Sequence, residues 1–205
     1  MNIILFGPPG VGKGTQAKLI AKDFNLNILS LGDILREEIK NKSKIGYKIE
    51  ELQNSGKLIK NDIIIQIIKD KIQNNMLFDG FPRTLDQAVF LQRLNIKIDC
   101  IINIKLNDEI IINRLKYRLI HQKSGRIYNT LYNPPKIKNI DNLTGEILIK
   151  RKDDTAESII LRLNEYKKNT HPILNYLKHI KTINIDGNNN IKNIYLNIKE
   201  KINNI

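Results

Sequence analysis

Short apolar runs alternate along the chain with segments whose apolar residues recur three and four positions apart. The runs have the length of buried strands and cover residues 2–6, 27–29, 76–78, 100–104 and 182–185. The periodic segments predict helices whose buried faces carry Ala17, Ile20, Ala21 and Phe24; Ile63, Ile64, Ile67, Ile68 and Ile72; Ile111, Ile112, Leu115 and Leu119; and Ile191, Ile194, Ile198 and Ile202. Strands that alternate with helices predict an α/β fold, a five-stranded parallel sheet flanked by helices on both faces.

Two stretches, residues 30–59 and 120–150, interrupt this alternation. The first has the pattern of short helices and turns, and the second has hairpin-like alternation. The breaks are Gly32, Gly46 and Gly56 in the first stretch, and Gly125, 133–135 and 144–145 in the second. We expect both stretches to be insertions at the carboxyl edge of the sheet, where α/β proteins bind ligands. The asparagines at 188–190 are expected to form a loop that enters the last helix.

The composition limits the class of protein. The chain has 205 residues, 27% of them charged, and lacks Trp, which is the balance of a globular domain with small insertions. No apolar run approaches the length of a membrane span, and residues 2–6 lead into a glycine turn, which predicts a strand rather than a signal peptide. A lone cysteine, Cys100, excludes an internal disulfide and a multi-cysteine metal cage, and predicts a cytoplasmic location.

The formal net charge is +13. Such an excess attracts nucleic acids, acidic membranes and small phosphates alike. Lys and Arg are spread along the whole chain without a block typical of a nucleic-acid-binding arm. Charge alone therefore leaves these partner classes open.

A glycine-rich run, GPPGVGKGT at residues 7–15, lies between the first predicted strand and the first predicted helix. Glycines there allow backbone N–H groups to converge on a phosphate, and Lys13 can reach the outer phosphates. The alternative is a glycine turn with a solvated lysine, which the flanking strand and helix disfavour. The run predicts a nucleotide-phosphate cradle.

Charged and polar clusters follow at the ends of later predicted strands. Asp79-Gly80-Phe81-Pro82-Arg83 ends the third strand, and Gln87 follows in a segment that also fits a helix capping box from Thr84. Arg114 and Arg118 are four apart, and we expect them on one helix face, where two like charges favour a bound anion. Further positive charge comes from Arg36, Arg151 and Arg162.

The order and spacing of these motifs resemble the adenylate kinase family in its long-lid form. The run Gly-Lys-Gly-Thr, residues 12–15, carries the resemblance first, because Gly14 stands where GTPases and motor ATPases have a hydroxyl residue. The resemblance implies the P-loop nucleoside monophosphate kinase fold. It divides the chain into a core of residues 1–29, 60–117 and 156–205, an AMP-binding insertion of residues 30–59, and a lid of residues 118–155.

The resemblance also implies a role for individual residues. The catalytic cations would be Lys13, Arg83, Arg114, Arg151 and Arg162, with Arg114, Arg151 and Arg162 on the transferring phosphates. ATP would contact Gly10, Val11, Gly12, Lys13, Gly14, Thr15, Arg114, Arg118, Ile127, Tyr128 and Asn189. AMP would contact Leu31, Arg36, Lys57, Leu58, Ile59, Gly80, Phe81, Pro82, Arg83, Gln87, Arg151 and Arg162. Asp79 would hold Mg²⁺ through water, and Asp153 and Asp154 would orient arginines, although Asp154 also fits a helix N-cap.

In the resembled family the lid often binds zinc through four cysteines. His121, Ser124, Asp141 and Thr144 occupy those positions here at the same spacing. Ser and Thr are poor zinc ligands, so we expect no zinc and a hydrogen-bond network in its place.

Two positions depart from the family pattern. Leu31 stands where the family commonly has a threonine that touches the AMP base, and Leu119 stands where a second arginine often follows Arg118. We expect an adenylate kinase that uses Mg-ATP and AMP, acts as a monomer, and binds neither nucleic acid nor membrane. The alternatives are a GTP:AMP or a UMP/CMP kinase, and, from another class, a basic RNA-binding protein with a vestigial P-loop. The scattered aromatic residues disfavour the RNA-binding alternative.

Overall fold

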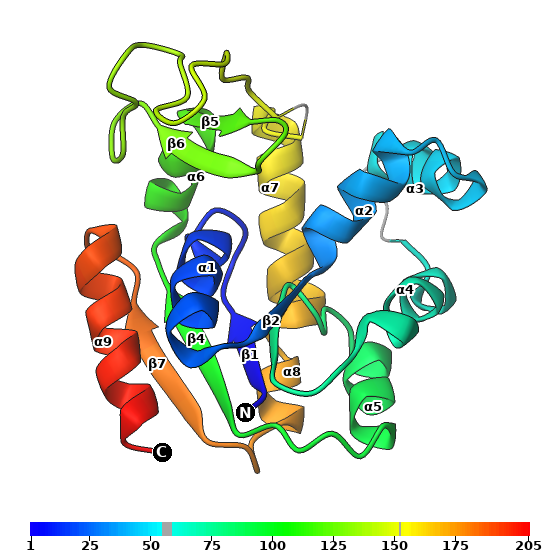
Figure 1. The fold of residues 1–205 in the computed structure, drawn as a ribbon. Helices are drawn as coiled ribbons and strands as arrows, with labels where there is room; N and C mark the ends of the chain where they lie inside the picture. Colours follow the sequence, from blue (N-terminus) through cyan, green and yellow to red (C-terminus); the bar gives the residue numbers. More distant parts are fainter. Residues whose placement is uncertain (55–58, 152) are drawn as a thin grey trace.

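The computed structural model describes residues 1–54, 59–151 and 153–205 (Figure 1). A parallel sheet with strand order β2-β3-β1-β4-β7 forms its centre. The strands are β1 (Ile3–Phe6), β2 (Asn27–Ser30), β3 (Met76–Asp79), β4 (Cys100–Lys105) and β7 (Thr182–Asp186). The α/β prediction and all five predicted strands are confirmed.

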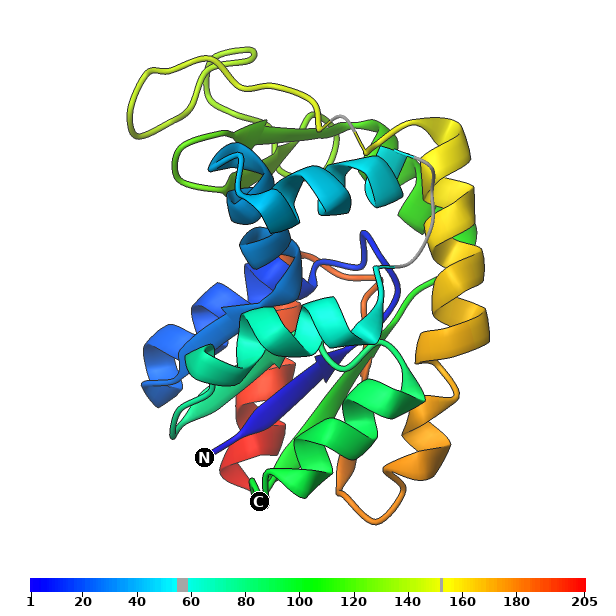
Figure 2. The same ribbon diagram turned by 90° about the vertical axis from the view of Figure 1, so that its right-hand side faces the viewer.

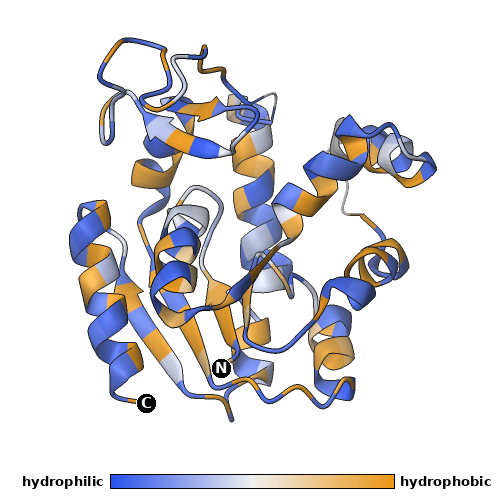
Figure 3. Ribbon diagram, in the orientation of Figure 1, coloured by the Kyte–Doolittle hydropathy of each residue, from blue (hydrophilic) through white to orange (hydrophobic). Residues whose placement is uncertain are grey.

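Helices cover both faces of the sheet. One face packs against α1 (Lys13–Phe24) and α9 (Ile191–Asn203), and the other against α4 (Asn61–Ile68), α5 (Leu85–Arg93) and α8 (Ile173–Tyr176). Beside the sheet, α6 (Asp108–Lys116) packs on α7 (Ala156–Glu165). Figure 3 shows the central strands mainly apolar and the helices banded in apolar and polar residues, as expected for helices that bury one face on a sheet.

The first insertion consists of α2 (Leu31–Lys40) and α3 (Lys44–Asn54), which stand beside the sheet at the right of Figure 1. Ser30 caps α2 by accepting a hydrogen bond from the Asp33 N–H group. Gly32 and Gly46 were expected as breaks, and that prediction is wrong, because Gly32 lies in the first turn of α2 and Gly46 lies inside α3. Gly56 lies outside the described residues. A Cβ atom on Gly46 would lie 2.2 Å from the carbonyl oxygen of Glu38, so glycine lets the two helices approach closely.

The second insertion is built on a hairpin of β5 (Arg118–His121) and β6 (Arg126–Asn129), with Ile149 bridged to Ile120. Leu119, Tyr128 and Leu148 form a small apolar cluster inside it. The prediction that Leu119 and Arg118 continue the helix of Arg114 is wrong. The α6 helix ends at Lys116, and the strand that follows turns Arg118 away from the helical register.

After α7 the chain continues without a loop into a π-helical turn, Tyr166–Thr170, and then into α8 (Figure 2).

None of the helices in the described ranges combines the length and apolar character that a bilayer crossing requires.

Candidate active site

A cavity of about 510 Å³ opens at the carboxyl ends of the strands. The parallel register aligns Asp79 with Leu5 on one side and Ser30 on the other, so the loops after β1, β2 and β3 share one edge of the sheet. Among the described residues that line the cavity, eight are Lys or Arg and three are Asp or Glu. The cavity is therefore suited to a strongly anionic ligand.

The floor of the cavity is the loop between β1 and α1. Gly10 has a φ of 83°, and a Cβ atom there would lie 2.6 Å from the Leu115 side chain, so only glycine fits. Among the hydrogen bonds of the described residues, none uses the N–H groups of Gly12, Lys13 or Gly14. Free N–H groups at a helix N-terminus bind phosphate, with the helix dipole adding favourable potential.

Lys13 is folded back onto this loop. Its Nζ atom donates to the carbonyl oxygens of Gly7 at 2.6 Å and Pro8 at 2.9 Å. Burial lowers the pKa of Lys13 to about 8, an effect that the Asp79 carboxylate opposes and nearby arginines strengthen. An anion in the cavity would favour the charged ammonium and compete with the two carbonyl groups for it.

The arginines come from segments far apart in the sequence. Arg83 follows β3, Arg118 begins β5, and Arg162 lies in α7. Burial and, to a smaller extent, the charge of Arg162 lower the pKa of Arg83 to about 10; burial first, and then the charge of Arg118, lower the pKa of Arg151 to about 10. The Nε atom of Arg151 is buried without a hydrogen-bond partner. These cations have too few counter-charges, as expected for groups that bind phosphate.

The carboxylates of Asp153 and Asp154 bind two of these arginines. Arg118 donates from Nε at 2.8 Å and Nη2 at 2.5 Å to the two carboxylate oxygens of Asp154. Arg162 donates to the Asp153 carboxylate at 3.1 Å. Both carboxylates thus bind arginines, whereas the alternative of an N-cap at Asp154 is wrong: Thr155 caps α7.

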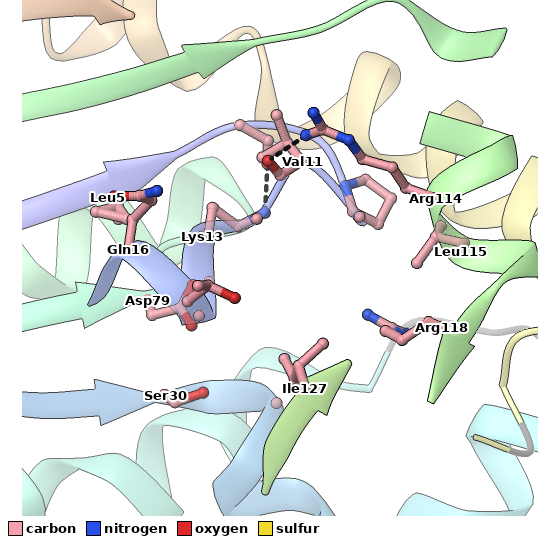
Figure 4. Close-up of a pocket in the computed structure, with 18 of the residues that line it drawn as sticks. Leu5, Val11, Lys13, Gln16, Ser30, Asp79, Arg114, Leu115, Arg118 and Ile127 are labelled. Atoms are coloured by element: carbon pink, nitrogen blue, oxygen red, sulfur yellow. Dashed lines mark hydrogen bonds between the residues drawn. The ribbon is translucent and has the colours of Figure 1, made fainter. Parts of the chain in front are cut away.

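Arg114 has different surroundings from the other arginines. It donates to the carbonyl oxygens of Val11 at 3.2 Å and Gly187 at 2.9 Å, and its guanidinium lies 5.5 Å from the ring centre of Tyr132. Figure 4 shows Arg114 reaching Val11 while Arg118, Asp79 and Ile127 surround the same cavity. Arg114 therefore joins the loop after β1 to the loop after β7, beside the lid.

Asp79 is the carboxylate at the end of β3. It is 9% exposed, and among the described residues its carboxylate accepts no hydrogen bond and forms no ion pair. Burial raises its pKa, which Lys13 and Arg83 oppose. Carboxylate oxygen is a ligand that Mg²⁺ prefers, and the Thr15 hydroxyl lines the same cavity. The donor set fits a hydrated Mg²⁺ that shares its ligands with phosphates; no cluster of three or more His, Cys, Asp or Glu side chains suited to a metal occurs in the described ranges.

Comparisons with known proteins agree with this geometry. A family model described as adenylate kinase matches residues 5–182. The adenylate kinase of Buchnera aphidicola subsp. Cinara cedri (strain Cc) is 46% identical over 212 residues, which cover 100% of this chain and 98% of the relative. That of Buchnera aphidicola subsp. Acyrthosiphon pisum (strain Tuc7) is 46% identical over 186 residues, 88% of this chain and 86% of the relative.

The chain belongs to the adenylate kinase family. Most residues that the resemblance assigned to nucleotides or to Mg²⁺ line this cavity: Gly10, Val11, Gly12, Lys13, Gly14, Thr15, Arg36, Asp79, Gly80, Pro82, Arg83, Arg114, Arg118, Ile127, Tyr128, Arg151, Arg162 and Asn189. Their assignment to ATP or AMP stays a prediction. Lys57 and Leu58 lie outside the described residues.

Four residues predicted to contact AMP lie apart from the lining of this cavity in the described structure. Leu31 is 1% exposed and Phe81 is 1% exposed, and Ile59 packs beside them against the same apolar core. Gln87 is buried, accepts from the Arg83 N–H group at 2.8 Å and donates to Asn61 at 2.9 Å. In this structure these four side chains, which the resemblance predicts to contact AMP, therefore pack or hydrogen-bond within the protein.

The capping-box prediction at Thr84 is half confirmed. The Thr84 hydroxyl accepts from the Gln87 N–H group at 3.3 Å, as in a capping box. The reciprocal bond goes to Arg83 instead of Thr84, one residue earlier. Gln87 therefore fixes the backbone of a cavity residue as well as starting α5.

In the lid, the four positions that replace zinc-binding cysteines form a hydrogen-bonded cluster. His121 contacts Ser124 at 2.7 Å through Nδ1, and the Thr144 hydroxyl donates to Asp141 at 2.9 Å. Arg126 donates to both Asp141 oxygens, at 2.8 and 2.5 Å, and these bonds hold the pKa of Asp141 far below its usual value. The predicted network is present, and we call these five residues the lid cluster.

Several residues of the lid cluster and of the cavity were not predicted from the sequence. Arg126 and Glu146, which contacts His121 at 2.7 Å, complete the lid network. Tyr132 and Thr170 line the cavity. Arg126 could have been predicted, because it follows Gly125 in the predicted turn of the lid. No sequence pattern around Thr170 indicated a role, since its hydrogen-bond partner, Arg83, lies 87 residues away.

Proposed function

We propose that the protein is an adenylate kinase that transfers a phosphoryl group reversibly from Mg-ATP to AMP and yields two ADP. The observation that carries the proposal is a single cavity that joins the phosphate cradle at Lys13 to Arg83, Arg151 and Arg162, which come from separate segments. Two phosphorylated substrates bring many negative charges to one place, and this cavity supplies the matching positive charge.

In the proposed mechanism, the bond between the γ-phosphorus of ATP and its bridging oxygen breaks, and a phosphate oxygen of AMP forms the new bond. That oxygen is already anionic near neutral pH, so no general base is needed. Lys13 and the arginines stabilise the charge on the moving group, and their positions are set before the reaction. Bound Mg²⁺ would add charge neutralisation, with Asp79 and Thr15 on its side of the cavity.

The donor nucleotide is assigned to the cradle, the lid hairpin and Asn189, and the acceptor to Arg36, Arg83 and the residues around Gly80. Arg114 lies between the cradle and Tyr132, which supports a role at the donor end, on the transferring phosphates. We also propose that residues 30–59 and 118–155 are separate subdomains that close over the substrates and exclude water.

We further propose that the protein is a monomer in the cytoplasm. The single cysteine, Cys100, is buried and unpaired, and burial raises the pKa of its thiol to about 11, which supports an inert side chain in a reducing compartment. Size-exclusion chromatography with light scattering tests the monomer.

The decisive assay is ADP formation from ATP plus AMP in the presence of Mg²⁺. Replacing ATP with GTP, and AMP with UMP or CMP, tests the alternative kinases in the same coupled assay. A turnover that requires ATP, AMP and Mg²⁺ together supports the proposal. Equal use of CMP or UMP would overturn the adenylate assignment, and binding of RNA without ADP formation would favour the non-enzyme alternative.

A further inference from the structure

The loop that carries Arg83 is held at three points. The Arg83 N–H group donates to Gln87 Oε1 at 2.8 Å, and its Nε atom donates to the Gly80 carbonyl at 2.7 Å. Both contacts are local. The third is not: the Thr170 hydroxyl donates to the Arg83 carbonyl oxygen at 3.0 Å from 87 residues away. Thr170 therefore ties the Arg83 loop to another part of the fold.

Thr170 belongs to the π-helical turn that continues α7. The His171 N–H group donates to the Tyr166 carbonyl at 2.8 Å across five residues. Such wide turns are rare and are frequently found at functional sites. They change the direction in which the following side chains point, because one extra residue enters the turn. Figure 2 shows α7 and this turn as one continuous helix along the side of the molecule.

The same helix carries Arg162 within the cavity, three residues before α7 ends at Glu165. The positive charges of Arg162 and Arg83 oppose each other, since Arg162 is the charged neighbour that most lowers the pKa of Arg83, after the larger effect of burial. A neutral hydrogen bond from Thr170 can hold the two segments together against this repulsion while the cavity lacks a phosphate.

We propose that Thr170 is a positioning residue for phosphoryl transfer, whose hydroxyl fixes the Arg83 loop on the helix that carries Arg162 and so sets the relative placement of the two guanidinium groups. This inference rests on the proposed kinase activity. With Nε bound to Gly80, the terminal nitrogens of Arg83 are the part that can reach a phosphate. A small shift of the loop would move them directly, and small misplacements of catalytic groups are costly.

The test replaces the hydroxyl without changing the size of the side chain. Thr170→Val removes the donor, and Thr170→Ser keeps it. We expect Thr170→Val to lower kcat for ADP formation by roughly two- to tenfold, the value of one neutral hydrogen bond, with the KM for ATP changed less than twofold. Thr170→Ser should restore kcat to within about twofold of the wild type on the same scale. Thr182→Val, which removes an exposed hydroxyl on β7 that donates to the Ile180 carbonyl oxygen, is the matched control and should leave kcat unchanged.

A double-mutant cycle shows whether Thr170 acts through Arg83. In an Arg83→Ala background, Thr170→Val should have no further effect on kcat, because the group that it positions is gone. An effect in that background equal to the effect in the wild type would overturn the inference, as would wild-type kcat in Thr170→Val. The wild-type enzyme in the same assay separates the two claims: if it forms no ADP from ATP and AMP, the proposed function fails first.

Discussion

The lid cluster and the phosphate cavity are both polar, but their charges are arranged in opposite ways. In the lid cluster, the Asp141 side chain is fully enclosed, and its carboxylate accepts hydrogen bonds from Arg126, Tyr128 and Thr144. The charges balance, and the pKa of Asp141 is lowered mainly by Arg126. In the cavity, burial and neighbouring cations lower the pKa values of Lys13, Arg83 and Arg151.

This difference indicates what each region is for. A polar cluster whose groups satisfy one another stabilises a fold, because no buried charge lacks a partner. A cluster of buried cations with too few anions destabilises the free protein and is relieved by a ligand that brings the missing charge. The lid cluster is complete in the free protein, whereas we propose that phosphates complete the charge balance of the cavity. The following predictions test this comparison.

Arg83→Ala should have the largest effect. Arginines that neutralise a transferring phosphoryl group contribute roughly 10³-fold or more to turnover, and we expect a loss of kcat on that scale with an unchanged circular dichroism spectrum. Arg93→Ala, an exposed arginine at the end of α5, is the control. A rise in the KM for AMP with kcat preserved would make Arg83 a residue of ground-state binding only.

Lys13→Met should lower turnover by roughly 10²-fold or more, as expected for loss of a group that stabilises the transition state. It should also make the free protein more stable at pH 7, because a buried charge without enough counter-charge is removed. For a chain of this size, each kcal/mol gained raises Tm by about 2–4 °C. Lys22→Met, at an exposed position of the same helix, should change neither activity nor Tm. Turnover within tenfold of the wild type would contradict the role of Lys13.

The pH dependence of this effect has a definite sign. The pKa of Lys13 is about 8 in the folded protein, below its usual 10.5. Between these values the unfolded chain binds more protons at Lys13 than the folded protein does, so the stability of the wild type rises with pH in this window. The stability gap to Lys13→Met should therefore be widest below pH 8 and should narrow toward pH 10. ATP affinity should fall as pH rises past 8, because the ammonium that binds phosphate loses its proton.

Asp141→Asn should affect the lid rather than the chemistry. The substitution removes the charge that two bonds from Arg126 satisfy, so we expect a lower Tm and an earlier loss of lid structure by hydrogen exchange, with kcat at low temperature changed less than about tenfold. Asp70→Asn, an exposed carboxylate outside the lid, is the control. Turnover abolished at every temperature would show that the cluster takes part in the reaction.

Treatment with a zinc chelator tests whether the lid is held by its hydrogen bonds alone. We expect no stoichiometric zinc in the purified protein, and we expect a chelator of zinc to leave Tm unchanged, because two of the four lid positions are Ser and Thr. One zinc ion per chain by elemental analysis, lost together with thermal stability, would refute this.

Leu31→Thr should have the smallest effect. A new neutral hydrogen bond to the AMP base is worth about 0.5–1.5 kcal/mol, so kcat/KM for AMP should rise by at most roughly tenfold. The structure adds a cost, because Leu31 is 1% exposed in the apolar core and the hydroxyl would be buried there; on that account we expect a loss of about 1–3 kcal/mol in unfolding free energy. AMP should remain the preferred acceptor of both proteins. A preference for CMP or UMP in either would show that the base is read elsewhere.

The sequence by itself determined the strands, the cradle and the family. Apolar runs and helical spacing are local patterns, so all five strands of the sheet could be located from them. The cradle is one contiguous run from Gly7 to Thr15, and its chemistry follows from residue types and order alone. The hydrogen-bonded cluster of the lid could be predicted for the same reason, because the identities of His121 and Ser124 exclude a four-thiolate site.

Only the tertiary structure decided which groups meet. A helical interpretation of Arg114 and Arg118 was natural from their spacing, but the chain leaves the helix at Lys116 and pairs Arg118 with Asp154, 36 residues away. The burial that lowers the pKa of Lys13 depends on the whole cavity. The tie between Thr170 and Arg83 joins segments 87 residues apart. Such contacts depend on how packed elements are placed relative to one another, and no local pattern along the chain encodes that placement.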